Sequence, residues 1–287
     1  MKESFIWVYL TNQYMKNPIG YSFITKEHEI QGWKGIWRRI KTILLLPFIP
    51  LYNCLAVLDV KRIHKKGSLY AIRNGRVCFY LPDLDLIHGD FIQNLIYLGG
   101  DYFDVGSLEK MKKYINSGAV VLDIGANIGN HSIFFAKECQ AGKIYSFEPT
   151  RRTFEILERN IRINHLEEKV KAMNIALGDQ QTKADVICVN KRNCGANKVN
   201  RNVNGSISME ALDNLAIKEK IEFIKIDVEG FEYEVLQGGV KTIDKNKPCI
   251  YIEIFDSNYD KVNSLLQSMN YAWVQKWSHD YLYMYQG

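Results

Sequence analysis

The chain has 287 residues, of which 47% are hydrophobic and 24% charged, with a formal net charge of +5. This balance indicates a globular protein that buries a full core, rather than a disordered chain. The six cysteines form no C-x-x-C pair, and the six histidines show no metal-ligand spacing. Residues 1–14 lack the basic start and long apolar stretch of a cleavable signal peptide, so we expect reduced thiols in a cytoplasmic protein.

The basic charge is concentrated in the N-terminal quarter. Residues 1–70 hold eleven Lys/Arg and four Asp/Glu, and residues 33–58 mix tryptophan and cations with an apolar run. A spanning helix needs about 20 apolar residues, and this run is short and broken by Pro47 and Pro50. Two interpretations remain open: a buried helical pair, or a segment lying in the interface of the inner face of a membrane. The aromatic pattern of an RNA-binding sheet is absent, which makes nucleic acid an unfavoured partner.

The sequence pattern of residues 67–118 indicates an accessory layer that leads into the core. Residues 68–72 and 77–81 suit a β-hairpin, because Asn74-Gly75 supplies the positive φ angles of its turn. Residues 83–98 are expected to form a helix or a lid. A short helix over residues 107–116, capped by Ser107, is expected next.

The chain is organised around residues 119–148. They predict a buried strand over 119–122, a glycine turn, a helix over 130–138 and a second strand that ends at Glu148. Gly125 and Gly129 allow a tight turn and a close approach of a ligand to the helix. Ligands bind beyond the carboxyl ends of such parallel strands.

The spacing of this turn favours S-adenosylmethionine over a dinucleotide. A dinucleotide site reads G-x-G-x-x-G, whereas here Asp123 precedes a turn with only Gly125 and Gly129. A carboxylate at Asp123 attracts the ammonium group of S-adenosylmethionine and would repel a pyrophosphate. Glu148 is suited to the two hydroxyls of a ribose. The alternative is an ordinary strand–turn–helix joint without a ligand.

After Pro149 the chain alternates between helices and strands, which implies a mostly parallel sheet. Asp179, after the third strand, is expected either to meet an adenine amino group or to form a plain turn. The expected elements are a helix over residues 150–164, strands over 170–177, 185–189 and 203–209, a polar loop over 190–204 and a helix over 210–217.

A second group of polar residues follows the strand expected over residues 223–226. Lys225, Asp227 and Glu229 come at the end where strands deliver side chains to a ligand. Glu253 ends the next buried strand, over residues 250–254. Converging carboxylates can accept a proton, raise each other's pKa or hold a divalent cation. The alternative is that Lys225 and Glu232 only solvate the ends of the strands, and each of them alone favours a structural role.

Four ordered blocks resemble the FkbM-type methyltransferases. The resemblance covers about residues 67–287, and its blocks lie at residues 121–131, 147–149, 174–179 and 223–232. It implies a class I methyltransferase fold: an α/β, Rossmann-like, seven-stranded and mostly parallel sheet with helices on both faces. Residues 271–276 and 281–285 suit its antiparallel last hairpin. The domains would be an extension (1–66), an accessory segment (67–118) and a methyltransferase domain (119–287).

The resemblance also implies S-adenosylmethionine as cofactor and O-methylation of sugars, polysaccharides or polyketide-type products. Phe231 stands where the family often has a small residue, and we expect this departure to reshape the pocket. By motif, the residues assigned to the cofactor are Asp123, Gly125, Ala126, Asn127, Gly129, Glu148, Pro149, Ala176, Leu177, Asp179 and Asp227.

Methyl transfer to oxygen requires an aligned nucleophile and removal of its proton. We expect Asp227 or Glu229 to be the base, with His131 and Lys225 as secondary candidates, and a divalent metal on Asp227 and Glu253 is possible without being required. The expected acceptor is a glycan, lipid-linked if residues 33–58 contact a membrane. Two alternatives are a non-catalytic S-adenosylmethionine-binding scaffold of a glycan-assembly complex and an RNA methyltransferase.

Overall fold

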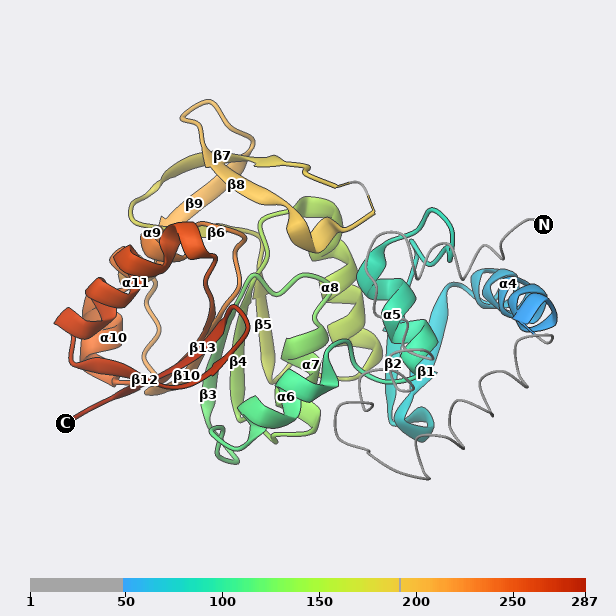
Figure 1. The fold of residues 1–287 in the computed structure, drawn as a ribbon, viewed down its shortest axis with the longest axis horizontal. Helices are drawn as coiled ribbons and strands as arrows, with labels where there is room; N and C mark the ends of the chain where they lie inside the picture. The colour runs from blue at the N-terminus through green and yellow to red at the C-terminus, as the bar shows by residue number, and fades with distance from the viewer. Residues whose placement is uncertain (1–48, 191) are drawn as a thin grey trace, which may run out of the picture. The chain divides into compact units, whose positions relative to one another are not determined.

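The structure is a computed structural model that describes residues 49–190 and 192–287, with side chains from residue 55 onward (Figure 1). The chain divides into two compact units, Met1–Phe103 and Asp104–Gly287. Residues 33–48 of the predicted interfacial segment lie outside the described residues. The three-part domain division stays a prediction.

The first unit contains helices α4 (Ile49–Lys65) and α5 (Phe91–Gly99) and strands β1 (Leu69–Ile72) and β2 (Val77–Tyr80). The two strands pair antiparallel, which confirms the predicted hairpin. Asn74 and Gly75 in its turn have φ angles of 56° and 81°, as the Asn-Gly signal requires.

Only the second half of the segment expected as a helix or lid is helical. α5 begins after Asp90, whose Oδ1 accepts a hydrogen bond from the amide of Gln93 at 3.0 Å. This carboxylate satisfies one of the free amides of the first turn and so fixes where the helix begins.

α4 has one buried and one exposed apolar face. Ala56, Val60 and Ile63 are buried, while Leu55 and Leu58 are 55% and 61% exposed. Among the described residues, no helix is long and apolar enough to cross a membrane.

The second unit is built on a seven-stranded sheet with the order β12-β13-β11-β10-β3-β4-β5. The β11-β10-β3-β4-β5 part is parallel, and β13 pairs antiparallel with both β11 and β12, so the predicted sheet and last hairpin are confirmed. The strands are β3 (Val120–Ile124), β4 (Lys143–Phe147), β5 (Val170–Met173), β10 (Ile221–Ile226), β11 (Cys249–Glu253), β12 (Tyr271–Trp277) and β13 (Asp280–Tyr285).

Side chains alternate between the two faces of this sheet because the strand period is two. On one face Leu122 and Ile224 join a core with Leu236 and Leu266 from α9 and α11. On the other face Phe223 stacks edge-on against Phe135 of α7. The helices are α6 (Val105–Lys112), α7 (Asn130–Lys137), α8 (Arg151–Ile163), α9 (Glu232–Gln237), α10 (Val240–Asn246) and α11 (Asp256–Ser268).

The predicted cap of α6 is wrong. The helix begins at Val105 with Asp104 as its N-cap residue, and Ser107 lies inside its first turn. The amides of Ser107 and Leu108 are bonded to the carbonyl oxygen of Asp104, at 3.1 and 3.2 Å. The first turn is therefore closed by the backbone, without a serine cap.

A second sheet interrupts the alternation that the sequence predicted. Its order is β6-β9-β7-β8, and it stands apart from the seven-stranded sheet (Figure 1). We call it the arm sheet. Its strands are β6 (Ala176–Gly178), β7 (Thr182–Ile187), β8 (Lys198–Arg201) and β9 (Ile207–Ala211).

Three predicted elements are corrected in this region. The strand expected over 170–177 is two strands in different sheets, because the side-chain amide of Asn174 bonds to the carbonyl oxygens of Glu148 and Pro149 at 2.8 and 2.9 Å and bends the chain. The loop expected over 190–204 contains β8. The helix expected over 210–217 is a single 3₁₀ turn, and the carboxylate of Asp213 in that turn accepts bonds from the first amides of α10.

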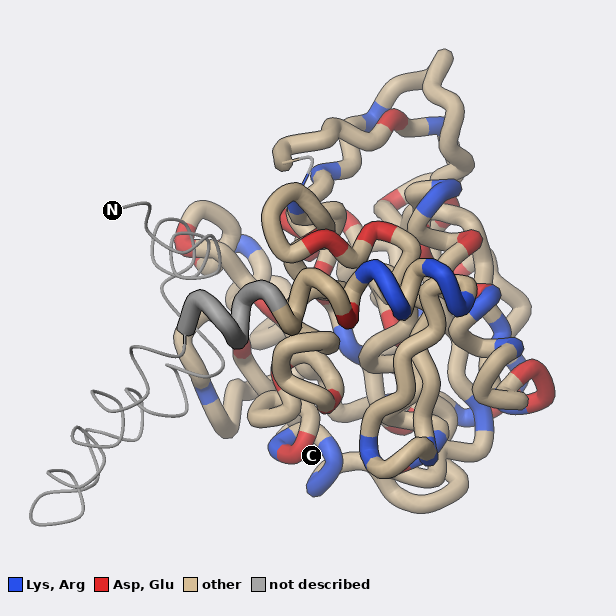
Figure 2. The backbone as a smooth tube through the Cα atoms, turned by 90° about the vertical axis from the view of Figure 1, so that its right-hand side faces the viewer, with Lys and Arg blue, Asp and Glu red and all other residues tan. Residues whose placement is uncertain are grey.

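Basic and acidic residues are interspersed along the backbone of the second unit (Figure 2). Residues 104–287 hold 24 Lys/Arg and 24 Asp/Glu, so the formal charges of this unit balance.

Candidate active site

The turn after β3 has the conformation that its glycines predict. Gly125 and Gly129 have φ angles of 80° and 91°, and Asn127 between them also lies in the left-handed region at 50°. The amides of Gly125 and Ala126 donate to the carbonyl oxygen of Phe147, at 3.0 and 2.9 Å. These bonds hold the turn against the end of β4, where Glu148 follows.

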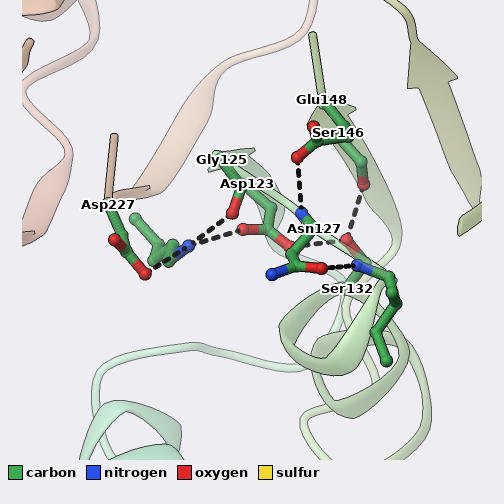
Figure 3. Close-up of polar contacts among 9 residues, drawn as sticks. Asp123, Gly125, Asn127, Ser132, Ser146, Glu148 and Asp227 are labelled. Atoms are coloured by element: carbon green, nitrogen blue, oxygen red, sulfur yellow. Dashed lines mark hydrogen bonds and ion pairs between the residues drawn. The ribbon is translucent and has the colours of Figure 1, made fainter. Parts of the chain in front are cut away.

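The carboxylate of Glu148 is tied to this turn. Its Oε2 accepts a bond from the amide of Asn127 at 3.0 Å (Figure 3), and its Oε1 accepts one from the amide of Thr150 at 2.8 Å. Burial raises the pKa of Glu148 to about 7, against the lowering effect of these two amides. Each carboxylate oxygen retains a second lone pair with which to accept a hydroxyl group.

Asp123 is fully buried beneath the turn. Its Oδ2 accepts a bond from the hydroxyl of Ser132 at 2.5 Å, and that hydroxyl lies 2.7 Å from the hydroxyl of Ser146 (Figure 3). Its Oδ1 is buried and accepts no hydrogen bond within the described part of the chain. The ammonium of Lys225 lies 3.5 Å from this oxygen.

A small pocket, open to solvent, lies beside the turn. Four of the residues assigned to the cofactor line it: Gly125, Pro149, Ala176 and Leu177. Its other lining residues are apolar, namely Ile124, Phe147, Ile175, Val199, Val228 and Phe231. Phe147 and Pro149, on either side of Glu148 in the sequence, both line this apolar pocket, whose character suits a flat aromatic ring.

Asp179 does not line this pocket. Its carboxylate is paired with the guanidinium of Arg201. This ion pair links the residue that follows β6 to β8, the strand at the other edge of the arm sheet. Phe231 does line the pocket, as its departure from the family pattern suggested.

Lys225 is buried between two carboxylates. Its ammonium nitrogen lies 3.5 Å from Oδ1 of Asp123 and 3.4 Å from Oδ2 of Asp227, and it donates to the carbonyl oxygen of Gly125 at 2.9 Å. Burial lowers the pKa of Lys225, but the two carboxylates outweigh burial and the net shift is upward. The group is therefore a permanent cation at neutral pH.

Three carboxylates meet beyond the ends of β10 and β11. Oxygen atoms of Asp227, Glu229 and Glu253 lie within 4.8 Å of one another, so the structure brings these predicted residues together. Burial, reinforced by the charge of Asp227, raises the pKa of Glu229 to about 7 and that of Glu253 to about 9. Such a cluster can hold a proton between its members or offer three oxygen ligands to a hard divalent cation.

Glu229 is the conformationally unusual member of this cluster. Its φ of 55° lies in the left-handed region, which is costly for a residue with a side chain. The following Gly230 has a φ of 106°. The bend directs the chain from β10 into α9.

His131 stands at the start of α7. Burial, aided by the charge of Lys225, lowers the pKa of His131 to about 3, although Asp227 acts in the opposite sense. The imidazole is neutral at physiological pH and has a very weak tendency to take up a proton.

Several contributors to the site were not identified from the sequence. The hydroxyl of Ser132 donates to Asp123 and lies within hydrogen-bond distance of the hydroxyl of Ser146. The side-chain amide of Asn174 bonds to the backbone after β4, and Val199 of β8 lines the pocket. Asn174 lies in a block that the resemblance already included. Val199 carried no signal, since it lies in a stretch that reads as polar loop.

The comparisons with known proteins agree with the motifs. A family model for the methyltransferase FkbM domain matches residues 123–281. The methyltransferase sdnD of Sordaria araneosa is 24% identical over 204 residues, covering 58% of this chain and 74% of that protein. The ribosomal protein L11 methyltransferase of Dictyoglomus thermophilum is 30% identical over 83 residues, covering 29% of this chain and 27% of that protein.

Among solved structures, the chain is similar to a methyltransferase FkbM from Methylobacillus flagellatus KT, with 16% identity and a TM-score of 0.43. The alignment covers 80% of this chain and 60% of that one, so the chain spans less than two thirds of that protein. The family model alone covers more than half of this chain. The chain therefore belongs to the methyltransferase FkbM domain family, a family of S-adenosylmethionine-dependent methyltransferases, as its motifs predicted.

Proposed function

We propose that this protein transfers a methyl group from S-adenosylmethionine to a hydroxyl oxygen of a sugar, a surface polysaccharide or a lipid-linked glycan. The proposal rests mainly on one observation: two candidate sites lie together at one edge of the sheet. The Gly125 turn with Glu148 forms a cofactor site, and the carboxylates after β10 and β11 form a base site.

The described residues fit the cofactor. Glu148 would accept the ribose hydroxyls, the apolar pocket beside Pro149 would hold the adenine ring, and Asp123 would attract the ammonium group directly or through water. S-adenosylmethionine supplies an activated, electrophilic methyl group. The protein's own work is to align the acceptor oxygen and to remove its proton.

Glu229 is the base that the geometry supports best. A pKa raised to about 7 matches the pH at which a general base works, whereas the pKa of His131 is lowered to about 3 and Lys225 is a permanent cation. Asp227 is paired with Lys225, so its oxygens are less available to an acceptor. A divalent cation held by Asp227, Glu229 and Glu253 would be an alternative way to lower the pKa of the acceptor hydroxyl.

The preference for a lipid-linked acceptor rests on α4. Leu55 and Leu58 are exposed, and Lys61, Arg62 and Lys65 follow on the same helix. Exposed apolar residues beside cations suit the interface of an anionic membrane. This would place the protein in the cytoplasm, peripherally on the inner face of the membrane.

The proposal is tested by transfer of labelled methyl groups from S-adenosylmethionine to a panel of sugars, polysaccharides and lipid-linked glycans. Glu229→Gln should lose at least about a hundredfold in turnover, the usual contribution of a general base, with its cofactor affinity retained. Glu222→Gln, on the same strand but before its buried end, is the control and should keep full activity.

Other outcomes would identify the alternatives. Transfer to RNA and to no glycan would favour an RNA methyltransferase. Cofactor binding without transfer to any acceptor would favour a scaffold of a glycan-assembly complex. Activity that is lost with a chelator and restored by Mg²⁺ would assign the carboxylate cluster to a metal. Full turnover in Glu229→Gln would refute the base assignment.

A further inference from the structure

The register of three parallel strands builds a polar row inside the sheet. Lys225 on β10 is the partner of Asp123 on β3, and Asp123 is the partner of Ser146 on β4. All three side chains are buried, and Ser132 of α7 adds its hydroxyl to the row. Hydrophobic residues normally occupy such positions, because a buried ammonium loses its hydration at a high cost in free energy.

The ammonium of Lys225 uses its donors to join three separate segments. It bonds to the carbonyl oxygen of Gly125 in the turn after β3, at 2.9 Å, and lies 3.5 Å from Asp123 and 3.4 Å from Asp227. Lys225 is 1% exposed, so the acceptor cannot reach it. Its charge also compensates Oδ1 of Asp123, the buried oxygen that accepts no hydrogen bond among the described residues.

The turn and Asp227 are packed too closely to move independently. A Cβ atom at Gly125 would overlap the carbonyl oxygen of Asp227, and the amide of Asp227 donates to the carbonyl oxygen of Ile124 at 3.1 Å. Lys225 adds a side-chain tie between the same two segments (Figure 3). The turn faces the cofactor pocket, and Asp227 belongs to the carboxylate cluster.

We propose that Lys225 is a positioning residue that ties the cofactor turn at Gly125 to the carboxylate cluster at Asp227. The inference rests on the proposed function, since it assigns the turn to cofactor binding. Lys225 touches neither the acceptor nor the reacting atoms. It acts through the carbonyl of Gly125 and through the two carboxylates.

The test is calorimetric titration of the full chain with S-adenosylhomocysteine, together with thermal unfolding of each variant. Lys225→Met removes both the bond and the charge, and Lys225→Gln keeps a donor while removing the charge. Each should raise the Kd of the folded fraction about tenfold or more, because the ammonium that ties the turn at Gly125 to Asp227 is removed. The folded fraction is given by the binding stoichiometry.

The double variant Asp123→Asn/Lys225→Gln tests the pairing and covers the case in which Lys225→Met fails to fold. It removes one uncompensated carboxylate, so it should unfold at a higher temperature than Lys225→Gln alone. Lys143→Met is the matched control. Lys143 begins β4, and its ammonium donates to the carbonyl oxygen of Glu168 at 3.1 Å, away from the turn at Gly125, so its loss should leave the Kd unchanged.

A purely structural lysine would lower the unfolding temperature or the stoichiometry and leave the Kd of the folded fraction unchanged. A Kd within twofold of the wild type in folded Lys225→Gln would therefore overturn the positioning role. Failure of the wild-type protein to bind S-adenosylhomocysteine would instead overturn the proposed function, so the two failures are distinguishable.

Discussion

Glu229, the proposed base, has a backbone conformation that opposes stability. Its left-handed φ of 55° costs about 1–2 kcal/mol for a residue with a Cβ atom, and its carboxylate lies beside two others. Such a cost is retained where the side chain has a task that glycine cannot perform.

Glu229→Gly is therefore expected to raise the free energy of unfolding by about 1 kcal/mol and to abolish turnover. Urea denaturation and methyl-transfer assays on the same preparations would measure both effects. Glu234→Gly, inside helix α9, is the control and should lose about 1 kcal/mol. A loss of stability in Glu229→Gly would show that the strained conformation is not costly.

The raised pKa of Glu253 predicts that the free energy of unfolding depends on pH. Its pKa is raised from 4.5 to about 9, chiefly by burial, so the folded protein keeps a proton that the unfolded chain has lost. The stabilising contribution of that proton is complete below about pH 4.5 and is lost as the pH rises through about 9.

Glu253→Gln mimics the protonated form at every pH. Relative to the wild type, it should gain at least about 1 kcal/mol of unfolding free energy between pH 5 and pH 8. Urea denaturation at several pH values measures this difference, with the exposed Glu158→Gln on α8 as control. A difference independent of pH would contradict the assignment of the shift to Glu253.

At the scale of elements, the parallel core was predictable because its strands are short, apolar and β-branched and end in recognisable turns. β3, β4, β10 and β11 lie where the sequence indicates them. The glycines at 125 and 129 fixed the turn, and Glu148 and Asp227 follow from their places at strand ends.

The arm sheet was not predictable by the same means. β8 reads Lys-Val-Asn-Arg and is mostly exposed, so it lacks the hydrophobic alternation of a half-buried strand. Its pairing with β7 depends on backbone bonds, and Val199 lines the pocket from it. The register that brings Lys225, Asp123 and Ser146 together is likewise a property of the sheet and not of any local pattern.

Val199 gives the arm sheet a testable role. Val199→Asp should weaken S-adenosylhomocysteine binding about tenfold or more, because it places a charge in an apolar pocket. Val189→Asp is the matched control, since Val189 is 56% exposed and does not line the pocket. Calorimetry on both variants measures the contrast, and equal effects would exclude β8 from the cofactor site.

At the scale of the whole molecule, the two units have different characters. The second carries the family domain, while the first carries the basic helix with exposed Leu55 and Leu58. The full chain should therefore sediment with phosphatidylserine vesicles, more weakly at high salt because the electrostatic part is screened.

Leu55→Glu/Leu58→Glu should reduce this sedimentation severalfold, because two charges would enter the apolar face. Val203→Glu, at a residue 73% exposed in the second unit, is the control. Equal sedimentation of all three proteins would contradict membrane docking through α4.

The measurement that tests the methyltransferase assignment most directly is calorimetric titration of the full chain with S-adenosylmethionine and S-adenosylhomocysteine, with NAD as the control ligand. We predict micromolar binding of the first two and none of NAD. Glu148→Ala should weaken that binding about tenfold or more, a change of about 1.4 kcal/mol, because it removes the carboxylate assigned to the ribose. No binding of either ligand by the folded wild-type protein would contradict the proposed activity.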